Sequence, residues 1–354
     1  MTDTFRQTIE AWDGESVLVS HDRTTETWIF IALHDTRLGC AVGGTRMKTY
    51  PTAVDGLVDA LRLGKGMTYK WAGIGIPFGG GKAVLATPGP LPHEERNGLL
   101  DRYGKLLASL RGAFRTGVDL GTTPEDLLRV DRGAGYVIGV ADGHSEDPGP
   151  YTALGVFGGI RAAVSHRFGT ESLEGRSVLV QGVGGVGRPL AELLAAEGAK
   201  IYVSDIDGEV ARAVAAGVEG QTVDPDDVYD ADVDVYAPCA VGATINPDTL
   251  PRLRCAIVAG SANNQLLSDA LAVGLRERGI LYAPDYIINA GGAMAFAGLY
   301  EGVTDKADLN ARVRGIEDSL RSIFSEARDA GESPLASAKR LAEGYLRDRA
   351  PDAA

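Results

Sequence analysis

Short apolar runs separated by polar turns open the chain. Ser16–Ser20 and Thr27–Leu33 are predicted strands, and the second is apolar almost throughout, as a strand covered on both faces would be. Apolar residues then recur at i, i+3, i+4 and i+7 from Val54, which predicts a helix from about Thr52 to Lys65. A second amphipathic helix is predicted at His93–Leu110. The first part of the chain therefore mixes strands and helices.

Glycines lie between these elements and predict tight turns or close backbone approach. Three of them predict such a turn: Gly39, Gly43 and Gly44. A short strand is expected at Ile74–Ile76, and a glycine run, Gly79–Gly81, separates it from another strand at Ala83–Leu85. Lys82 follows this run, and Lys70 precedes it. A lysine that is buried or crowded by a second cation loses its proton more easily and can serve as a base, whereas on a surface turn it is an ordinary solvated side chain.

A strand at Ala113–Val118 is expected to deliver Asp119 into a loop. Thr123 has the features of a helix cap, because a proline follows it and an acid stands three residues later, and the helix is expected to end near Arg132. Asp119 is a candidate acid at a site, or else a turn former. The polar, Gly- and Pro-rich segment Asp142–Pro150 is the clearest break in the chain, as expected for about two domains in 354 residues.

Beyond the break, Thr152 is predicted to cap a linking helix that ends near Arg167. A regular alternation of strands and helices then begins. A strand at Ser177–Gln181 precedes six residues of the pattern G-x-G-x-x-G, which are Gly182, Val183, Gly184, Gly185, Val186 and Gly187. A helix and a strand at Lys200–Ser204 follow, and Asp205 ends the unit. This is the dinucleotide fingerprint in its required setting. A carboxylate at Asp205 suits ribose hydroxyls and repels a 2′-phosphate, so NAD is expected over NADP.

The alternation continues with predicted strands at Asp234–Ala237, Cys255–Ala259 and Leu281–Ala283. The fold class is therefore α/β, with a doubly wound sheet in the second domain. Ligands bind beyond the carboxyl ends of such strands, which makes Asn264 and Asn289 site candidates, unless they only cap helices. Two helices are predicted to close the chain, at Leu309–Ala327 and Pro334–Arg347.

Composition narrows the function. A net charge of -13 argues against nucleic acid or an anionic membrane as partner. Three cysteines without a C-x-x-C pair indicate a reducing compartment, and five scattered histidines indicate no metal site. We see no signal peptide and no membrane segment, so a cytoplasmic protein is expected.

Several short motifs together resemble the glutamate/leucine/phenylalanine/valine dehydrogenase family over nearly the whole chain. They are Val42–Met47, Gly66–Lys70, Pro77–Lys82, Thr116–Asp119, Ala237–Ala240, Ser261–Asn264, Tyr282–Tyr286 and Asn289–Gly292. The resemblance implies an α/β substrate-binding and oligomerisation domain at residues 1–145, with residues from about 330 to 354 packing back on it. It also implies an NAD-binding Rossmann domain at residues 146–329 and a homo-oligomer of undetermined size.

The resemblance also implies roles for single residues. Lys82 and Asp119 would be catalytic. Lys70 and the backbone N–H of Gly44 would hold the substrate α-carboxylate, Asn264 would contact the substrate, and further substrate contacts would come from Val42, Met67, Gly117, Ala293 and Phe296. The cofactor would be held by the fingerprint with Asp205, Thr152, Ala240 and Asn289.

The implied reaction is reversible oxidative deamination of an L-amino acid to a 2-oxo acid and ammonia. Family members that use glutamate place Lys and Ser where Val42 and Phe296 stand, and neither can pair with a side-chain carboxylate. A hydrophobic amino acid is therefore expected. Leucine-type members tend to carry Ala where Gly117 stands and phenylalanine-type members Gly, which makes room for a ring, whereas Phe296 is larger than the Val or Leu usual at its position. Phenylalanine or another aromatic therefore leads slightly over leucine and valine.

Two other classes of protein fit the sequence less well than an amino-acid dehydrogenase. A hydroxyacid dehydrogenase would need a catalytic histidine, and no histidine stands in a motif at a strand end. A non-catalytic NAD-binding protein would keep the fingerprint and lose Lys70, Lys82 or Asp119, all of which are present.

Overall fold

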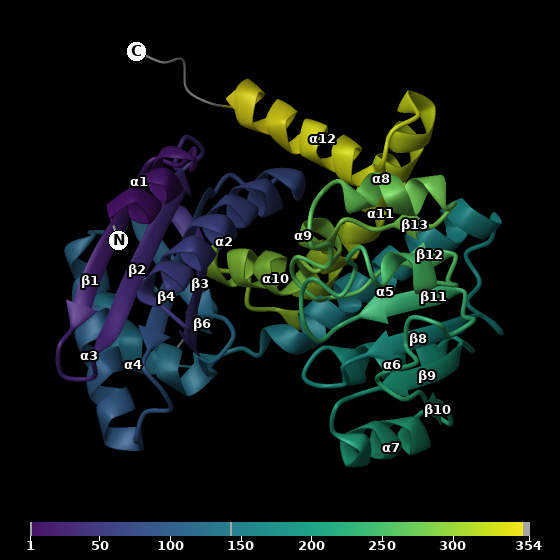
Figure 1. Ribbon diagram of the computed structural model, residues 1–354, viewed down its shortest axis with the longest axis horizontal. Coiled ribbons are helices and arrows are strands. Elements are labelled where there is room, and N and C mark those ends of the chain that lie inside the picture. The colour runs from purple at the N-terminus through teal and green to yellow at the C-terminus, as the bar shows by residue number, and fades with distance from the viewer. Residues whose placement is uncertain (1, 142–143, 350–354) are drawn as a thin grey trace. The chain divides into compact units, whose positions relative to one another are not determined.

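The computed structural model describes residues 2–141 and 144–349, with side chains for 6–140 and 146–349. The chain forms two compact units (Figure 1). Unit 1 holds the chain through Glu146, together with Leu299–Gly302 and the segment from Ala342 onward; unit 2 holds Asp147–Gly298 and Val303–Leu341. The division between Glu146 and Asp147 lies one residue from the boundary expected from the sequence. The C-terminal segment assigned to unit 1 starts at Ala342, whereas the sequence predicts a start near residue 330.

Unit 1 is built on a five-stranded mixed sheet of order β1-β2-β4-β3-β5. Its strands are β1 (Ser16–Asp22), β2 (Thr27–Asp35), β3 (Ala41–Thr49), β4 (Gly79–Thr87) and β5 (Phe114–Val118). The strand β2 runs antiparallel to β1 and β4, while β3 runs parallel to β4 and β5. The helices of this unit are α1 (Thr2–Glu10), α2 (Ala53–Gly73), α3 (His93–Ser109) and α4 (Pro124–Ala134). A short hairpin follows, β6 (Val140–Ala141) and β7 (His144–Ser145).

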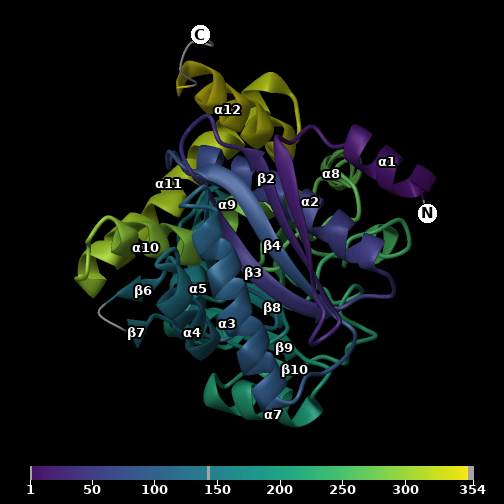
Figure 2. The same ribbon diagram turned by 90° about the vertical axis from the view of Figure 1, so that its left-hand side faces the viewer.

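The two faces of this sheet bury different helices. Leu99 and Tyr103 of α3 pack with Ala83 and Leu85 of β4 on one face, which Figure 2 shows behind α3. Leu57, Ala60 and Leu61 of α2 pack with Phe30, Ala32, Val84 and Ala86 on the other. Because side chains alternate along a strand, Lys82 lies on the same face as Val84, under α2.

Three expectations for this unit were wrong. Gly43 and Gly44 lie inside β3 and not in a turn, the run Gly79–Gly81 begins β4, and Ile74–Ile76 forms no strand because α2 continues to Gly73 and is capped by Ile74. The expected close approach of backbone is present. A Cβ at Gly80 would lie 2.0 Å from Oγ1 of Thr68 on α2. The glycines therefore let the helix and the sheet pack closely.

Unit 2 contains a six-stranded parallel sheet of order β10-β9-β8-β11-β12-β13. Numbered from its first strand, this is the order 3-2-1-4-5-6 of the Rossmann fold. The strands are β8 (Ser177–Gln181), β9 (Lys200–Ser204), β10 (Gln221–Thr222), β11 (Val235–Pro238), β12 (Ile257–Val258) and β13 (Leu281–Tyr282). The fold class is therefore α/β with two domains, as the sequence predicts.

The remaining helices are α5 (Pro148–Phe168), α6 (Gly187–Ala196), α7 (Gly208–Gly217), the 3-10 helix η1 (Leu250–Arg252), α8 (Leu271–Glu277), α9 (Asp285–Ile288), α10 (Gly291–Tyr300), α11 (Lys306–Ala330) and α12 (Pro334–Arg349). They belong to unit 2, except for the last two residues of α10 and the part of α12 from Ala342, which belong to unit 1. The cap of α5 is Asp147, whose carboxylate accepts a hydrogen bond from the N–H of Gly149. The expectation that Thr152 caps this helix is wrong, because a Pro at the first turn moves the start upstream. Within the described part of the chain, no helix is long and apolar enough to cross a membrane.

Candidate active site

A buried ion pair joins the two residues predicted to be catalytic. Nζ of Lys82, on β4, lies 2.9 Å from Oδ1 of Asp119, and the two side chains are only 6% and 14% exposed. Asp119 stands directly after β5, in a loop held by Thr122, whose Oγ1 accepts from the N–H of Asp119 and donates to the carbonyl oxygen of Thr45. The strand β4 therefore positions Lys82, and the loop held by Thr122 positions Asp119.

The carboxylate of Asp119 has a second cation. Nε of Arg46, on β3, donates to Oδ2 of Asp119 at 2.8 Å. Burial by itself would raise the pKa of Asp119, but the charges of Lys82 and Arg46 and the hydrogen bonds from both lower it well below its usual range. Asp119 is therefore ionised at neutral pH.

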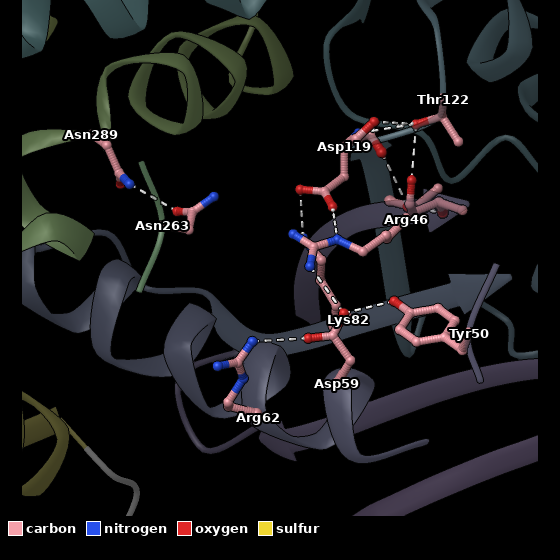
Figure 3. Close-up of polar contacts among 12 residues, drawn as sticks. Arg46, Tyr50, Asp59, Arg62, Lys82, Asp119, Thr122, Asn263 and Asn289 are labelled. Carbon is pink, nitrogen blue, oxygen red and sulfur yellow. Dashed lines mark hydrogen bonds and ion pairs between the residues drawn. The ribbon is translucent and has the colours of Figure 1, made fainter. Parts of the chain in front are cut away.

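Arg46 also connects Asp119 to a second group of polar residues, which is centred on Asp59 (Figure 3). The guanidinium of Arg46 also donates from Nη1 to Oδ2 of Asp59 on α2, at 2.9 Å. The same oxygen accepts from the hydroxyl of Tyr50 at 2.6 Å, and Oδ1 of Asp59 accepts from Arg62 at 3.1 Å. Sequence reasoning did not select Arg46 or Asp59. The available signal was a charged residue, Arg46, within an otherwise apolar and glycine-rich motif.

The register of the sheet places other predicted substrate residues on the same face. Thr45 and Thr116 point toward α3, since the hydroxyl of Thr45 contacts both Tyr103 and Thr116 at 2.6 Å. Their neighbours Gly44 and Gly117 are paired across β3 and β5 and therefore face α2. Val42 faces the same way two residues earlier. A Cβ at Gly44 would lie 2.8 Å from Cβ of Asp119.

Two more predicted substrate residues, Met67 and Lys70, lie on α2, which covers this face. Both are half-buried. Met67 reaches β3, because a Cβ at Gly43 would lie 3.2 Å from Cγ of Met67. Lys70 stands in the last turn of the helix. Unit 1 therefore collects seven predicted residues, together with the newly recognised Arg46, on one sheet face, its covering helix and the loop after β5: Val42, Gly44, Met67, Lys70, Lys82, Gly117 and Asp119.

The fingerprint in unit 2 has the geometry expected around a dinucleotide. Gly182 follows β8 with φ +89, and a Cβ there would lie 2.6 Å from Cβ of Ala240, which follows β11. These two residues stand on either side of the point where the strand order reverses, the usual ligand position of a doubly wound sheet. No described atom lies within 4 Å of a Cβ built at Gly184 or Gly185. Backbone at these two positions is therefore accessible to a phosphate.

Asp205 follows β9 and is tied to the fingerprint. Its Oδ2 accepts from the N–H of Val183 at 2.9 Å, and its Oδ1 accepts from the N–H of Asp207 at 3.0 Å. The carboxylate is partly exposed and keeps acceptor capacity for further donors. The residues present therefore fit the ribose end of a dinucleotide.

Asn289 lies at the end of α9 and is buried, at 6% exposure. Its Nδ2 donates to Oδ1 of Asn263 at 2.8 Å and to the carbonyl oxygen of Ser261 at 3.1 Å. Its Oδ1 is buried and has no hydrogen-bond partner within the described structure. A buried amide oxygen without a donor is costly, and a ligand amide could supply that donor.

The other predicted residues of unit 2 lie on α5, on α10 and in the segment before α8. Thr152 donates to the carbonyl oxygen of Pro148 and accepts from the N–H of Gly292, which joins α5 to the start of α10. Asn264 has φ +52, a left-handed conformation that asparagine tolerates better than most residues. On α10, Ala293 is half-buried and Phe296 is buried. In the described part of the chain, no group of three or more His, Cys, Asp or Glu side chains could hold a metal ion.

Two family models match most of the chain. The model described as Glu/Leu/Phe/Val dehydrogenase, dimerisation domain, matches residues 18–130, and the model described as Glutamate/Leucine/Phenylalanine/Valine dehydrogenase matches residues 210–336. The chain belongs to this family. As a Glu/Leu/Phe/Val dehydrogenase it is an amino-acid dehydrogenase, and the resemblance seen in its motifs is confirmed. The competing class of hydroxyacid dehydrogenases is rejected.

Relatives within the Glu/Leu/Phe/Val dehydrogenase family belong to its hydrophobic amino-acid branch. A leucine dehydrogenase of Thermoactinomyces intermedius is 42% identical over 95% of this chain and 91% of its own length. A phenylalanine dehydrogenase of Caldalkalibacillus thermarum is 40% identical over 99% and 95%. The crystal structure of L-tryptophan dehydrogenase from Nostoc punctiforme superposes with a TM-score of 0.80, at 39% identity, and covers 99% of both chains.

Proposed function

We propose that this dehydrogenase catalyses the reversible, NAD-dependent oxidative deamination of a hydrophobic L-amino acid. The net reaction converts the amino acid, NAD⁺ and water to a 2-oxo acid, ammonium, NADH and a proton. The observation that carries the proposal is the buried pair of Lys82 and Asp119, on the sheet face that also presents Val42 and Gly117. Chemistry at the amino-acid carbon needs a proton carrier of this kind.

The chemistry supplied by NAD, when bound, is acceptance of the hydride from the substrate Cα. The remaining work is hydrolysis of the resulting iminium, and it falls to the chain. Lys82 takes a proton from the water that attacks the iminium carbon, and then returns a proton to the departing amine. Asp119, with Oδ1 at 2.9 Å from Nζ of Lys82, stabilises the ammonium form between these two events.

The substrate's α-carboxylate is assigned to Lys70 and to the backbone N–H of Gly44. A fixed cation and a fixed N–H group orient the Cα hydrogen without taking part in bond breaking. Asn264 is assigned to the substrate's carboxylate and amino group. For the side chain, the buried Val42 and Phe296 offer no charge to a carboxylate, so a hydrophobic group is preferred.

Between hydrophobic substrates, Gly117 favours an aromatic ring slightly, because the missing methyl group leaves room beside the sheet. Leucine or valine is the alternative, and it is supported by the similarity to leucine dehydrogenases. A purified enzyme should reduce NAD⁺ with at least one of L-Phe, L-Trp, L-Leu or L-Val and not measurably with L-Glu. Turnover with none of the hydrophobic amino acids would overturn the proposal.

A second experiment tests the proton carrier. Lys82→Ala is expected to lower kcat at least about 100-fold, the size of a general acid–base contribution, with NAD binding retained. Binding of NADH, measured by its own fluorescence, is the matched control for the folding of unit 2. Full turnover by this variant would contradict the assigned mechanism.

The cofactor is proposed to bind the fingerprint Gly182–Gly187, with Asp205 on the ribose, Asn289 near the nicotinamide amide, and Thr152 and Ala240 beside it. Asp205→Asn keeps an acceptor for the N–H of Val183 and removes the charge that repels a 2′-phosphate. We expect the NADP-to-NAD ratio of kcat/KM to rise about tenfold, equivalent to about 1.4 kcal/mol. Asp207→Asn, two residues away and exposed, should leave the ratio unchanged. An unchanged ratio in Asp205→Asn would show that this carboxylate does not select the cofactor.

We also infer a homo-oligomer, because the match to a dimerisation-domain model covers residues 18–130.

A further inference from the structure

We propose that Arg46 is a positioning residue for this reaction: it holds one oxygen of Asp119 so that the other oxygen stays aimed at Lys82 while Lys82 gains and loses its proton. The inference rests on the proposed function, in which Lys82 carries the proton. It adds a role for Arg46, and for Asp59 behind it, that the assignment of Lys82 and Asp119 does not contain.

The first support is the division of the two oxygens of Asp119. Oδ1 lies 2.9 Å from Nζ of Lys82, and Oδ2 lies 2.8 Å from Nε of Arg46. A carboxylate held by a single cation can rotate about its bond to Cβ, whereas one held at both oxygens cannot do so without breaking a charge-assisted hydrogen bond. Arg46 therefore fixes which oxygen faces Lys82.

The second support is that Arg46 is itself anchored. Its side chain is 13% exposed, and its Nη1 donates to Asp59, whose side chain is 10% exposed. Tyr50 and Arg62 occupy further acceptor sites of the Asp59 carboxylate. Burial would raise the pKa of Asp59, but the Tyr50 hydrogen bond and the charge of Arg46 lower it below its usual value. Arg46 thus spans two ionised carboxylates from different elements, a task for which its planar fork is suited and a lysine is not.

The third support is the charge count around the pair. With Lys82 protonated, three cations (Arg46, Arg62 and Lys82) face two carboxylates, Asp59 and Asp119. When Lys82 is neutral, two cations face two carboxylates, and Asp119 still has Arg46. Without Arg46, loss of the Lys82 proton would leave the buried Asp119 with no cation of this group, which is strongly unfavourable.

The surroundings of the pair include the other charged groups of α2. Lys70 lies on the same helix as Asp59 and Arg62 and is assigned to the substrate carboxylate, and the Tyr50 hydroxyl is neutral because burial and its hydrogen bond to Asp59 raise its pKa. These groups are unchanged when Arg46 is replaced. The effect of the replacement therefore reports on the contacts of Arg46 with Asp119 and Asp59.

The test compares Arg46→Gln with the wild type over a range of pH. The variant removes one cation from the group around the buried Lys82–Asp119 pair, so the acidic limb of kcat/KM should move upward by about one pH unit. At the optimum, kcat should fall about 10- to 100-fold, as for a displaced catalytic group, while KM for the amino acid changes less than about threefold. A purely structural role would lower the melting temperature and leave the limb in place, and would overturn the proposal.

Arg46→Lys is the second variant, because it keeps a buried cation and is expected to fold. It should leave the acidic limb within about 0.3 pH units of the wild type but lower kcat several-fold, since one ammonium cannot bridge both carboxylates. Full kcat in Arg46→Lys would show that the orientation of Asp119 does not depend on the planar guanidinium group of Arg46, and would contradict this part of the proposal.

Arg102→Gln is the matched control. Arg102 lies on α3, against the other face of the sheet, and its Nε and Nη2 lie 2.6 and 2.8 Å from the carboxylate of Asp22. Its replacement removes an Arg–Asp pair from the same unit and should leave kcat and the acidic limb unchanged. If the wild type turns over no hydrophobic amino acid, the proposed function fails; if it is active and Arg46→Gln behaves like Arg102→Gln, only the present inference fails.

Discussion

Gly185 and Gly187 stand two residues apart in the fingerprint, yet they have different surroundings. A Cβ at Gly187 would lie 1.9 Å from the carbonyl oxygen of Gly182, whereas none of the described atoms lies within 4 Å of a Cβ at Gly185. Gly187 is therefore required by the fold itself. Gly185 is required to be a glycine only if a ligand comes close to its backbone.

This difference yields a prediction. Gly187→Ala should destabilise the ligand-free protein by about 1–3 kcal/mol, because backbone must shift to admit the methyl group. Gly185→Ala should keep the wild-type melting temperature without NAD and lose most of the increase that NAD produces. Calorimetry with and without NAD measures both. The assignment of Gly185 to the cofactor fails if its variant is stabilised by NAD as strongly as the wild type.

At this scale the sequence selected Lys82 and Asp119, whose side chains the structure pairs, but not the residues that support them. Lys82 could be selected because it follows a glycine run, and Asp119 because it follows the end of a predicted strand. Arg46 was missed because the glycines before it predicted a turn, and only the packing of β3 with β5 and α2 shows that Arg46 is buried between Asp59 and Asp119. Thr152 was misread because Pro148 moves the helix start upstream to Asp147.

The helix α4 follows the loop that carries Asp119, and its cap closes that loop. Oγ1 of Thr123 accepts from the N–H of Asp126 at 3.2 Å, and the carboxylate of Asp126 accepts from the N–H of Thr123 at 2.8 Å. The prediction of this capping box from sequence is confirmed. The sequence could locate it because the cap, the proline and the acid lie within four consecutive residues, Thr123–Asp126.

Loss of this cap should be measurable. Thr123→Ala is expected to lower the free energy of unfolding by about 1 kcal/mol, because the N–H of Asp126 loses its acceptor. Thr123→Ser keeps the hydroxyl and should lose less than half of that amount. Urea unfolding followed by circular dichroism gives both values, and equal losses in the two variants would mean that the hydroxyl is not what stabilises the helix start.

Element boundaries that depend on tertiary packing were the ones missed. The strand β3 contains two adjacent glycines, and β4 begins with three, so local propensity favours turns at both places. The glycines are instead used where α2 crosses the sheet, since Thr68 leaves no space for a Cβ at Gly80. By contrast, the strand–glycine–helix pattern of unit 2 is local, and β8 and β9 have the predicted limits.

At the scale of the whole molecule, the edges of the unit 1 sheet differ. The edge at β5 is covered in part, because Ile138 donates to the carbonyl oxygen of Thr116 at 2.6 Å. At the other edge, no strand of the described chain pairs with the outer side of β1. Val19 on β1 is 43% exposed. An open edge with exposed apolar side chains is a natural pairing surface.

We therefore predict that β1 contributes to the proposed homo-oligomer. Val19→Lys should shift the mass measured by light scattering after size exclusion toward a smaller species, because a charge on an edge strand opposes pairing. Lys65→Met, which removes a surface ion pair between α2 and Asp13, is the control and should leave the mass unchanged. An unchanged mass for Val19→Lys would place the subunit contact elsewhere.

The central strand β4 has a consequence for motion during turnover. All nine of its residues are buried, and it is hydrogen-bonded to β2 on one side and β3 on the other. The amide hydrogens around Lys82 should therefore exchange with deuterium only when unit 1 unfolds as a whole, whereas those of the edge strand β1 exchange through smaller openings. Mass spectrometry should find the β4 peptide protected already without ligands, and any added protection with amino acid and NAD should match the gain in the free energy of unfolding of the unit. The backbone that carries the proposed proton acceptor would then be a stationary part of the catalytic cycle, and any rearrangement would occur around it.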